Sequence, residues 1–372
     1  MTSPADAGAR PASRPDARAL DSVYDRLRER VAAGDVPAAA LAVGNSNGLI
    51  RSEAFAAHPR DRLDVDSFFF LASLTKPIFA TAFMRLVEDG LLELREPIAR
   101  WLPEFDTPDA RERREVTAWH LLTHTSGLPD IHPEQIRASR PSAARMLEMT
   151  LSAPLNFRPG SRFEYCSATY YLLGELIHRL SGVPYPTFLA EQVLRPLGMQ
   201  ATFDPRGGGR RLVFVHGVGA EGRLRRWLLL RYIVSIAVPG GGLWGTLDDL
   251  LRFGAALLRP QRRDGNRYVP LGPSTIEQMM ADHLGGRVSG VFDGEERPVH
   301  FGLAWNKPTL MPEIGGSARV VSHGGATGTL MWIDPDSDLV VIYFSNQWDA
   351  DRAPEREALQ GVYAALQRAT RG

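Results

Sequence analysis

A serine and a lysine three residues apart form the first pair in this sequence whose types and spacing could do chemistry. They are Ser73 and Lys76, within the segment "FFFLASLTKPIFATAFMRLVEDG" (68–90), whose apolar stripe predicts a helix that begins near the serine. Positions i and i+3 project from the same face of a helix, so the amine would lie beside the hydroxyl. The chain therefore offers a candidate nucleophile with a candidate base.

Lysine is rare here, because Lys76 and Lys307 are the only lysines among 43 basic residues. Arginine keeps its proton near neutral pH, whereas a desolvated lysine can lose it and act as a general base. By chance alone a Ser-x-x-Lys would arise in roughly one such chain in ten. The alternative interpretation is that Lys76 is a solvated helix residue with a serine nearby by accident.

The elements around this pair predict an α+β fold. Residues 19–34 predict a helix closed by Gly34, and Asn47-Gly48 between two apolar runs predicts a hairpin. Strand-like periodicity returns after residue 300 in "HFGLAWN", "ARVVSHGG", "TLMWIDP" and "DLVVIYFSN", before a final helix over 353–368. We expect an antiparallel β-sheet formed by both chain ends, flanked by helices, with a mostly helical lobe inserted over roughly 93–260.

Composition excludes several classes of protein. The chain has 372 residues, 44% of them hydrophobic, and a formal net charge of zero, so we expect no nucleic-acid and no membrane partner. Residues 1–18 are rich in Pro, Ala and Arg and predict a disordered tail without a secretory signal. A cytoplasmic location is the default expectation, and a periplasmic or secreted one stays open. One cysteine, Cys166, excludes an internal disulfide.

An Arg-rich segment, 206–231, could be a basic binding face, although such a run is more often a solvated surface. The runs "RLVFVHG" (211–217) and "WLLLRYIVSIAV" (227–238) flank it and predict a hairpin near the pocket.

His120 and His124 have the i, i+4 spacing of zinc ligands, but the glutamate that would follow the first histidine is missing. We expect His124 to hydrogen-bond within the "THTSG" turn, and no metal.

Five segments resemble one known family in order along residues 19–368. "SLTK" after "FFFLA" looks like the nucleophile motif of the serine β-lactamase-like family, which includes class C β-lactamases, D-alanyl-D-alanine peptidases and family VIII carboxylesterases. The others are "HLLTHTSGLPD" (120–130), "FEYCSATYYLLGELIHRLSG" (163–182), "PGGGLWGTLDDLLRF" (239–253) and "SHGGATGTLMWIDPDSDLVVIYFSN" (322–346). The resemblance implies a single catalytic domain over 19–372 with that family's fold.

The resemblance also implies roles for particular residues. Ser73 would be the acylated nucleophile, Lys76 its base, and Tyr165 a member of the proton network that protonates the leaving group. His323 stands where many relatives have the lysine of a Lys-Thr-Gly motif, and Gly324 and Gly325 follow it. The N–H groups of Ser73 and Ala326 would form the oxyanion hole, and no cofactor is implied.

Two departures from the family pattern concern the substrate. Many relatives read Tyr-x-Asn where this chain reads Tyr165-Cys166-Ser167, and the segment 323–326 lacks the lysine cation and the hydroxyls that grip a carboxylate. Both favour a carboxylesterase acting on small uncharged esters. The alternatives are a β-lactamase or D-Ala-D-Ala carboxypeptidase and, in another class, a penicillin-binding sensor or scaffold without turnover.

Overall fold

The structure, a computed structural model, describes residues 15–57, 63–106, 111–219, 222–259, 270–307, 314–349 and 351–369. The first helix begins at Ala17, two residues inside the stretch predicted as a tail. Residues 1–14 of that predicted tail lie outside the described residues, so its disorder stays a prediction.

Helices and strands alternate at both ends of the chain and helices dominate its middle. The helices are α1 Ala17–Ala33, α2 Thr75–Glu88, α3 Ala118–Leu122, α4 Pro133–Ser139, α5 Ala143–Ser152, α6 Thr169–Ser181, α7 Tyr185–Leu189, α8 Arg223–Ile236, α9 Leu247–Leu258, α10 Pro273–Met280 and α11 Ala353–Ala369. The strands are β1 Ala38–Asn45, β2 Gly48–Ala56, β3 Phe68–Phe70, β4 Leu212–Val213, β5 Trp244–Gly245, β6 Ser289–Phe292, β7 Glu295–Pro298, β8 Val321–Gly325, β9 Thr329–Asp334 and β10 Leu339–Ser345. Short 3₁₀ turns include η1, Ala72–Leu74, which leads directly into α2.

The central sheet confirms the predicted fold class. Its five strands lie in the order β2-β1-β10-β9-β8, and every neighbouring pair is antiparallel. Strands from the start of the chain pair with strands from its end, as the register Leu41↔Tyr343 shows. The Asn47-Gly48 hairpin joins β1 to β2, and the turn over 335–338 joins β9 to β10.

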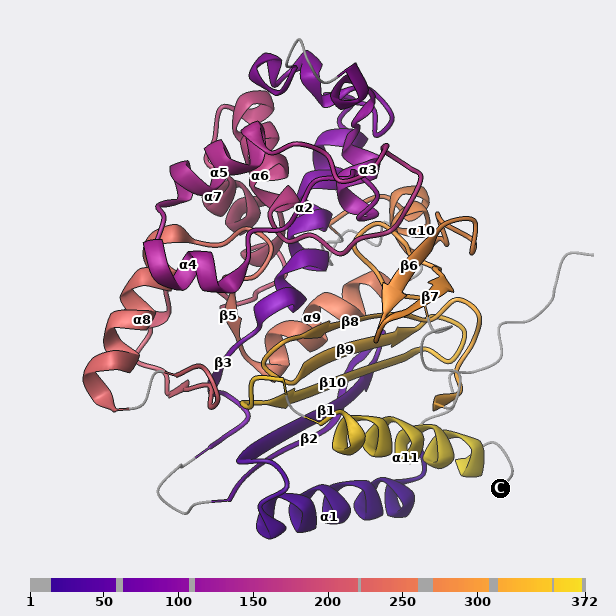
Figure 1. Cartoon of the computed structure of the whole chain (residues 1–372). Helices are drawn as coiled ribbons and strands as arrows, with labels where there is room; N and C mark the ends of the chain where they lie inside the picture. Colours follow the sequence, from indigo (N-terminus) through magenta and orange to yellow (C-terminus); the bar gives the residue numbers. More distant parts are fainter. Residues whose placement is uncertain are drawn as a thin grey trace, which may run out of the picture.

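Alternate side chains of the sheet enter two different cores, because successive residues of a strand point to opposite faces. On one face α1 and α11 lie side by side and cover residues such as Leu41 and Trp332. On the other face α9 and α2 cover residues such as Ala42 and Ile342, and the helical lobe lies beyond them (Figure 1). The predicted active-site segment thus lies between the sheet and the lobe.

Several local predictions are confirmed by the helix ends. Gly34, with φ of 83°, closes α1, as predicted from its freedom to adopt a left-handed conformation. Thr246 caps α9 by accepting a hydrogen bond from the Asp249 N–H, and the Asp249 carboxylate accepts one from the Thr246 N–H. Because α9 packs against β1 and β10, this cap helps fix the layer that supports the site.

Two local predictions are wrong. The Arg-rich region does not form a hairpin, because residues 223–236 form the helix α8 and only Leu212–Val213 pair as a short strand. Its first turns combine arginine and leucine, which favour helix, with few β-branched residues. The "HFGLAWN" segment is not a strand either, since only isolated bridges link Phe301 to Asn306 and Asn306 to Ser322.

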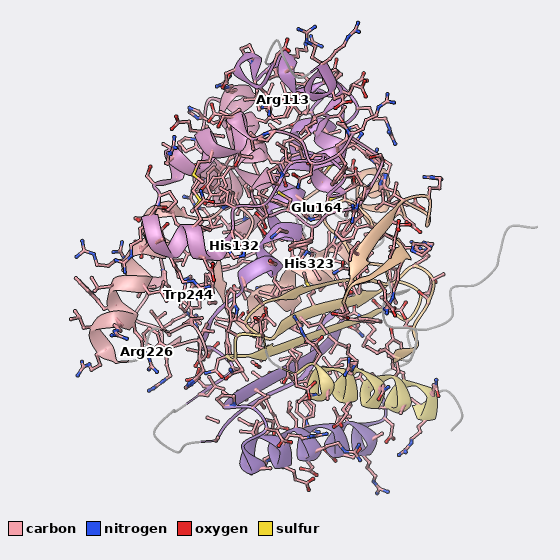
Figure 2. The ribbon with its side chains drawn as sticks, viewed as in Figure 1. Arg113, His132, Glu164, Arg226, Trp244 and His323 are labelled. Atoms are coloured by element: carbon pink, nitrogen blue, oxygen red, sulfur yellow. The ribbon has the colours of Figure 1, made fainter. Side chains whose placement is uncertain are left out.

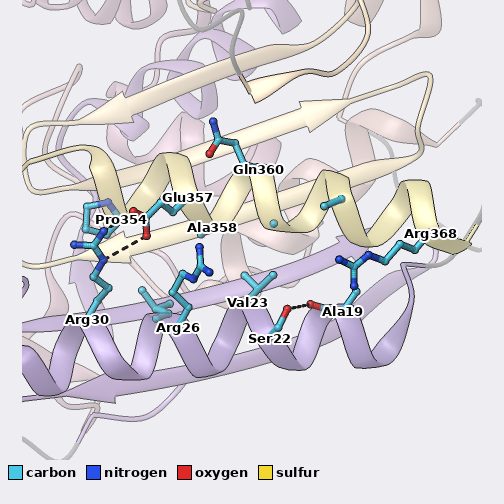
Figure 3. Close-up of a pocket in the computed structure, with 13 residues that line it drawn as sticks. Ala19, Ser22, Val23, Arg26, Arg30, Pro354, Glu357, Ala358, Gln360 and Arg368 are labelled. Carbon is cyan, nitrogen blue, oxygen red and sulfur yellow. Dashed lines mark hydrogen bonds and ion pairs between the residues drawn. The ribbon is translucent and has the colours of Figure 1, made fainter.

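A groove of about 330 Å³ lies between α1 and α11 (Figure 3). Its lining includes Val23, Arg26, Arg30, Glu357, Ala358 and Arg368. These helices cover the face of the sheet opposite α2, so this groove is separate from the Ser-x-x-Lys segment.

Among the described residues, none of the helices combines the length and the apolar character that crossing a bilayer requires.

Candidate active site

Ser73 lies in the turn η1 at the start of α2, where the chain leaves strand β3. The preceding residue, Ala72, has a φ of 47°, which a non-glycine residue adopts only under local constraint. Three contacts hold this backbone. The Leu71 N–H donates to the Leu243 carbonyl at 2.9 Å. The hydroxyls of Thr327 and Thr329 donate to the carbonyls of Phe70 at 2.8 Å and Leu71 at 3.0 Å. Ser73 itself stays half-buried, so its hydroxyl can meet a substrate.

The Lys76 amine meets the Ser73 hydroxyl, as the spacing predicted. Its Nζ lies 3.1 Å from Ser73 Oγ, 3.1 Å from Ser167 Oγ and 2.9 Å from the Gly240 carbonyl oxygen. Lys76 is 0% exposed, so the interpretation of it as a solvated helix residue is wrong. No carboxylate within the described residues forms an ion pair with it.

These three contacts match the donors of a lysine amine. Its N–H groups reach the Ser73 hydroxyl, the Ser167 hydroxyl and the Gly240 carbonyl. The other lysine, Lys307, is also buried, but it donates to the carbonyls of Met280 and Arg319 and contacts no hydroxyl. The pairing of an amine with a serine hydroxyl is therefore particular to Lys76.

Tyr165 contacts the amine through the face of its ring and not through a hydrogen bond. The Lys76 Nζ is 4.9 Å from the centre of the Tyr165 ring, and Tyr165 is 39% exposed. Tyr165 is therefore partly open to solvent beside the amine. A second phenol ring, that of Tyr170, lies 5.2 Å from the amine on the buried side.

His124 hydrogen-bonds to the loop that carries Tyr165. Its Nδ1 accepts a hydrogen bond from the Cys166 N–H at 3.2 Å, so the neutral ring carries its hydrogen on Nε2. Burial, followed by the charge of Lys76, holds the pKa of His124 well below its usual range. The prediction that His124 hydrogen-bonds within the "THTSG" turn is therefore wrong for its side chain, which bonds instead to the backbone of Cys166 in the segment 163–182.

His323 occupies the predicted place on β8 as a neutral group. Its Nδ1 donates to the Gly324 carbonyl at 2.8 Å, which leaves Nε2 as an acceptor. Burial, with a smaller effect from the Lys76 charge, lowers the pKa of His323 to about 3. The ring centre lies 6.2 Å from that of Tyr165. The labelled His323 of Figure 2 lies in the interior, where the sheet meets the α2 layer.

Gly325 allows β8 to approach the nucleophile segment. A Cβ added there would lie 2.5 Å from the Leu71 carbonyl oxygen and 3.3 Å from the Ala72 Cβ, closer than packed side chains allow. Ala326 follows immediately and is half-buried, as Ser73 is. The predicted oxyanion-hole residues thus belong to two backbone segments in direct contact.

Sequence reasoning missed several residues of this site. The Gly240 carbonyl gives no signal, because every residue type carries one, although the "PGGG" segment was among those noted. Thr327 and Thr329 anchor the nucleophile strand through contacts more than 250 residues apart in sequence. Cys166 is buried, and burial raises the pKa of its thiol, which agrees with its interpretation as a small packed residue.

Comparison with known proteins agrees with this geometry. The profile of the family described as Beta-lactamase matches residues 23–365. The chain belongs to the beta-lactamase family. The predicted family and its fold are thereby confirmed, as is the broad prediction of a serine hydrolase with a small-molecule substrate.

Individual relatives of this beta-lactamase-family chain carry different names. Esterase EstB of Burkholderia gladioli is 30% identical over 370 residues, which cover 88% of this chain and 89% of that protein. A putative D-alanyl-D-alanine carboxypeptidase of Escherichia coli K12 is 26% identical over 309 residues, 76% of this chain and 69% of that protein. The solved structure of a penicillin-binding protein homolog from Caulobacter crescentus has a TM-score of 0.77 at 20% identity, covering 95% of this chain and 99% of that one.

Proposed function

We propose that this chain is a carboxylesterase that cleaves small uncharged esters through an acyl-enzyme on Ser73. The observation that carries the proposal is the buried Lys76 amine, 3.1 Å from the Ser73 hydroxyl and without an ion-pair partner among the described residues. An amine in this setting can remove the hydroxyl proton as the oxygen attacks a carbonyl carbon.

The first half of the reaction acylates Ser73. Lys76 takes the hydroxyl proton, Ser73 Oγ bonds to the ester carbonyl carbon, and the developing oxyanion is held by the N–H groups of Ser73 and Ala326. The ester C–O bond then breaks, and the departing alkoxide takes a proton from the Tyr165–Lys76 network. The products are an alcohol and an ester of Ser73.

The second half repeats these steps with water. Water loses a proton to the same network and attacks the acyl carbon, and Ser73 Oγ leaves with a proton returned from Lys76. Ser167, which contacts the amine at 3.1 Å, keeps Lys76 aimed at Ser73 through both halves. The net reaction consumes one water and releases an acid and an alcohol.

The charge state of the segment 323–326 favours uncharged substrates. His323 is neutral at ordinary pH, because its pKa lies near 3, so it supplies no cation for a carboxylate. The buried ring Nε2 has no hydrogen-bond partner within the described residues. The nearby Arg352 guanidinium is engaged with the buried Glu355 carboxylate and with the Gly325 carbonyl. The likeness to esterase EstB supports the same direction.

The test is a substrate panel run with purified enzyme. We expect p-nitrophenyl esters of increasing chain length to be hydrolysed far faster than a chromogenic cephalosporin or a D-Ala-D-Ala peptide, and Ser73→Ala to abolish all turnover. Cys166→Ala is a matched control beside the site and should keep activity. Faster turnover of the cephalosporin or the peptide would replace the esterase by the β-lactamase or carboxypeptidase alternative. Stable acylation by a β-lactam without ester turnover would favour the sensor.

A further inference from the structure

Helix α8 exposes an apolar surface that the proposed reaction does not use. Leu224 is 68% exposed, Trp227 48% and Leu228 40%, whereas most large apolar residues among the described part of the chain are buried. Their spacing of three and four residues places them on one face of the helix. The exposed Arg231 lies one turn further along this face, with its guanidinium 4.7 Å from the centre of the Trp227 ring.

Residues of the second half of α8 hold the helix on the protein. Leu230 and Val234 pack with Phe68 and Trp244, and Ile236 packs in a second small cluster. Because these contacts anchor α8, the exposure of its apolar residues does not come from a loosely attached helix. Figure 1 shows α8 projecting from the side of the molecule beside β3, and Figure 2 labels Arg226 near the lower end of this helix and Trp244 where the helix meets the body.

The charge around this face is strongly one-sided. The chain as a whole is neutral, yet segment 206–236 contains seven arginines and a single acidic residue, Glu221. The helix α8 itself contains four arginines and no acid. Arg223 and Arg225 neighbour Leu224 in sequence, so they project about 100° to either side of the apolar stripe.

These arginines differ from those elsewhere in the protein. Many other arginines of the described residues form ion pairs with Asp or Glu, for example Arg179 with Glu175 and Arg352 with Glu355. None of the four arginines of α8 has a carboxylate partner within the described part of the chain. Arg226 and Arg231 lie over aromatic rings instead. The positive charge is thus left available to an anionic surface.

We propose that α8 is an interfacial helix that binds an anionic phospholipid surface. Leu224, Trp227 and Leu228 would enter the boundary between headgroups and acyl chains, and the flanking arginines would pair with phosphate groups. Apolar residues with tryptophan on one side and arginine beside them are the composition that such a surface recognises. This revises the expectation of no membrane partner, which came from the net charge and not from its distribution.

The position of α8 gives such binding a consequence for the active site. Residues 237–239 connect the end of the helix to Gly240, whose carbonyl accepts a hydrogen bond from Lys76. The buried side of α8 contacts β3, which leads into Ser73. A lipid surface at α8 would lie next to the segments that build the site, and esters dissolved in that surface would be within its reach. This last point rests on the proposed function, whereas lipid binding itself does not.

The test is sedimentation with vesicles, using full-length Ser73→Ala protein so that the result is independent of turnover. We expect binding to vesicles of phosphatidylcholine with 30% phosphatidylglycerol, little binding to phosphatidylcholine alone, and weaker binding at higher salt. Arg223→Glu/Arg225→Glu should weaken binding at least about tenfold. Leu224→Ser/Trp227→Ser/Leu228→Ser should also weaken it, and circular dichroism would check that both variants fold.

Matched controls carry the same changes elsewhere. Arg18→Glu/Arg26→Glu reverses two exposed arginines of α1, and Leu49→Ser/Leu91→Ser/Val291→Ser removes three exposed apolar residues. Both should bind vesicles as the parent does. The proposal is overturned if the parent ignores anionic vesicles, or if the controls lose as much binding as the α8 variants. Self-association that depends on α8 without vesicle binding would also overturn it and would assign the face to a second copy of the chain.

Discussion

The imidazole of His124 lies against the phenol ring of Tyr165, with ring centres 4.4 Å apart. The same imidazole accepts a hydrogen bond from the N–H of Cys166, the residue after Tyr165. One buried ring thus contacts both the Tyr165 side chain and the backbone that follows it. Because Tyr165 is 39% exposed, this contact helps to hold its ring beside Lys76.

Removing only the phenol hydroxyl should therefore separate chemistry from packing. Tyr165→Phe keeps the ring on His124 and loses the group that shuttles a proton, so kcat should fall about 10²- to 10⁴-fold with little change in thermal stability. Tyr232→Phe removes a hydroxyl that bonds only to the Pro141 carbonyl and is the control. Steady-state kinetics on a p-nitrophenyl ester measures both. Full activity in Tyr165→Phe would reduce Tyr165 to a packing role.

Replacing the base while keeping its charge gives a sharper contrast. Lys76→Arg retains a cation but cannot lose its proton near neutral pH, so kcat should fall by at least about a thousandfold. The larger guanidinium also has to fit beside Ser167 and Gly240, so folding must be confirmed by circular dichroism. Lys307→Arg makes the same change at the other buried lysine and should leave kcat within a fewfold of the parent. Near-normal turnover by Lys76→Arg would remove the base assignment.

The close approach of β8 to the nucleophile segment predicts a steric effect. Gly325→Ala places a Cβ against the Leu71 carbonyl and the Thr329 hydroxyl, so β8 must move away from Ser73 and the oxyanion hole must widen. Loss of one oxyanion contact lowers kcat about 10²- to 10³-fold. Gly207→Ala, where an added Cβ meets open space, is the control. Equal kcat values for the two variants would show that Gly325 does not set this distance.

The sequence predicted the elements whose signals are local. The spacing of Ser73 and Lys76, the Asn47-Gly48 hairpin and the Thr246 cap each depend on residues within one turn, and all three are present in the structure. The stacking of His124 on Tyr165 joins segments 41 residues apart, and neither ring gives a sign of the other in the sequence. The hydrogen bond from Lys76 to Gly240 is invisible for a second reason, because its acceptor is a backbone carbonyl, which every residue type carries.

The wrong prediction of a hairpin where the structure has helix α8 also has a physical cause. The run "WLLLRYIVSIAV" is apolar on every side, so its periodicity cannot separate a strand from a helix that is covered on one face and exposed on the other. The first turn of the helix, residues 223–226, consists of Leu224 and three arginines, and it lies outside the run whose pattern predicts a strand. The exposed apolar face that results could be recognised only once the buried face was known.

Burial of His323 predicts that the protein loses stability in acid. Its pKa is about 3 in the folded protein and about 6.5 in an unfolded chain, so between these values the unfolded chain binds the extra proton. Because of this residue, the free energy of unfolding should fall by roughly 1.4 kcal/mol for each unit by which the pH is lowered within this window. Above about pH 6.5 this residue should have no effect on it. Urea unfolding at pH 7, 6, 5 and 4 measures this.

The variant His323→Gln removes the titration and should flatten that dependence. Its stability should fall less than that of the parent between pH 6 and pH 4, even if it is less stable at pH 7. His132→Gln, at an exposed histidine, should keep the slope of the parent. Identical slopes for the parent and His323→Gln would mean that His323 is not held neutral.

The covalent attachment point is the most direct measure of the central claim. A serine-reactive p-nitrophenyl phosphonate would be added in excess, and the labelled peptide would be identified by mass spectrometry beside Ser73→Ala and Lys76→Arg proteins. The account predicts one label per chain, on Ser73, absent in Ser73→Ala and formed at least about a thousandfold more slowly in Lys76→Arg. A label on another residue, or labelling at the parent rate in Lys76→Arg, would contradict it.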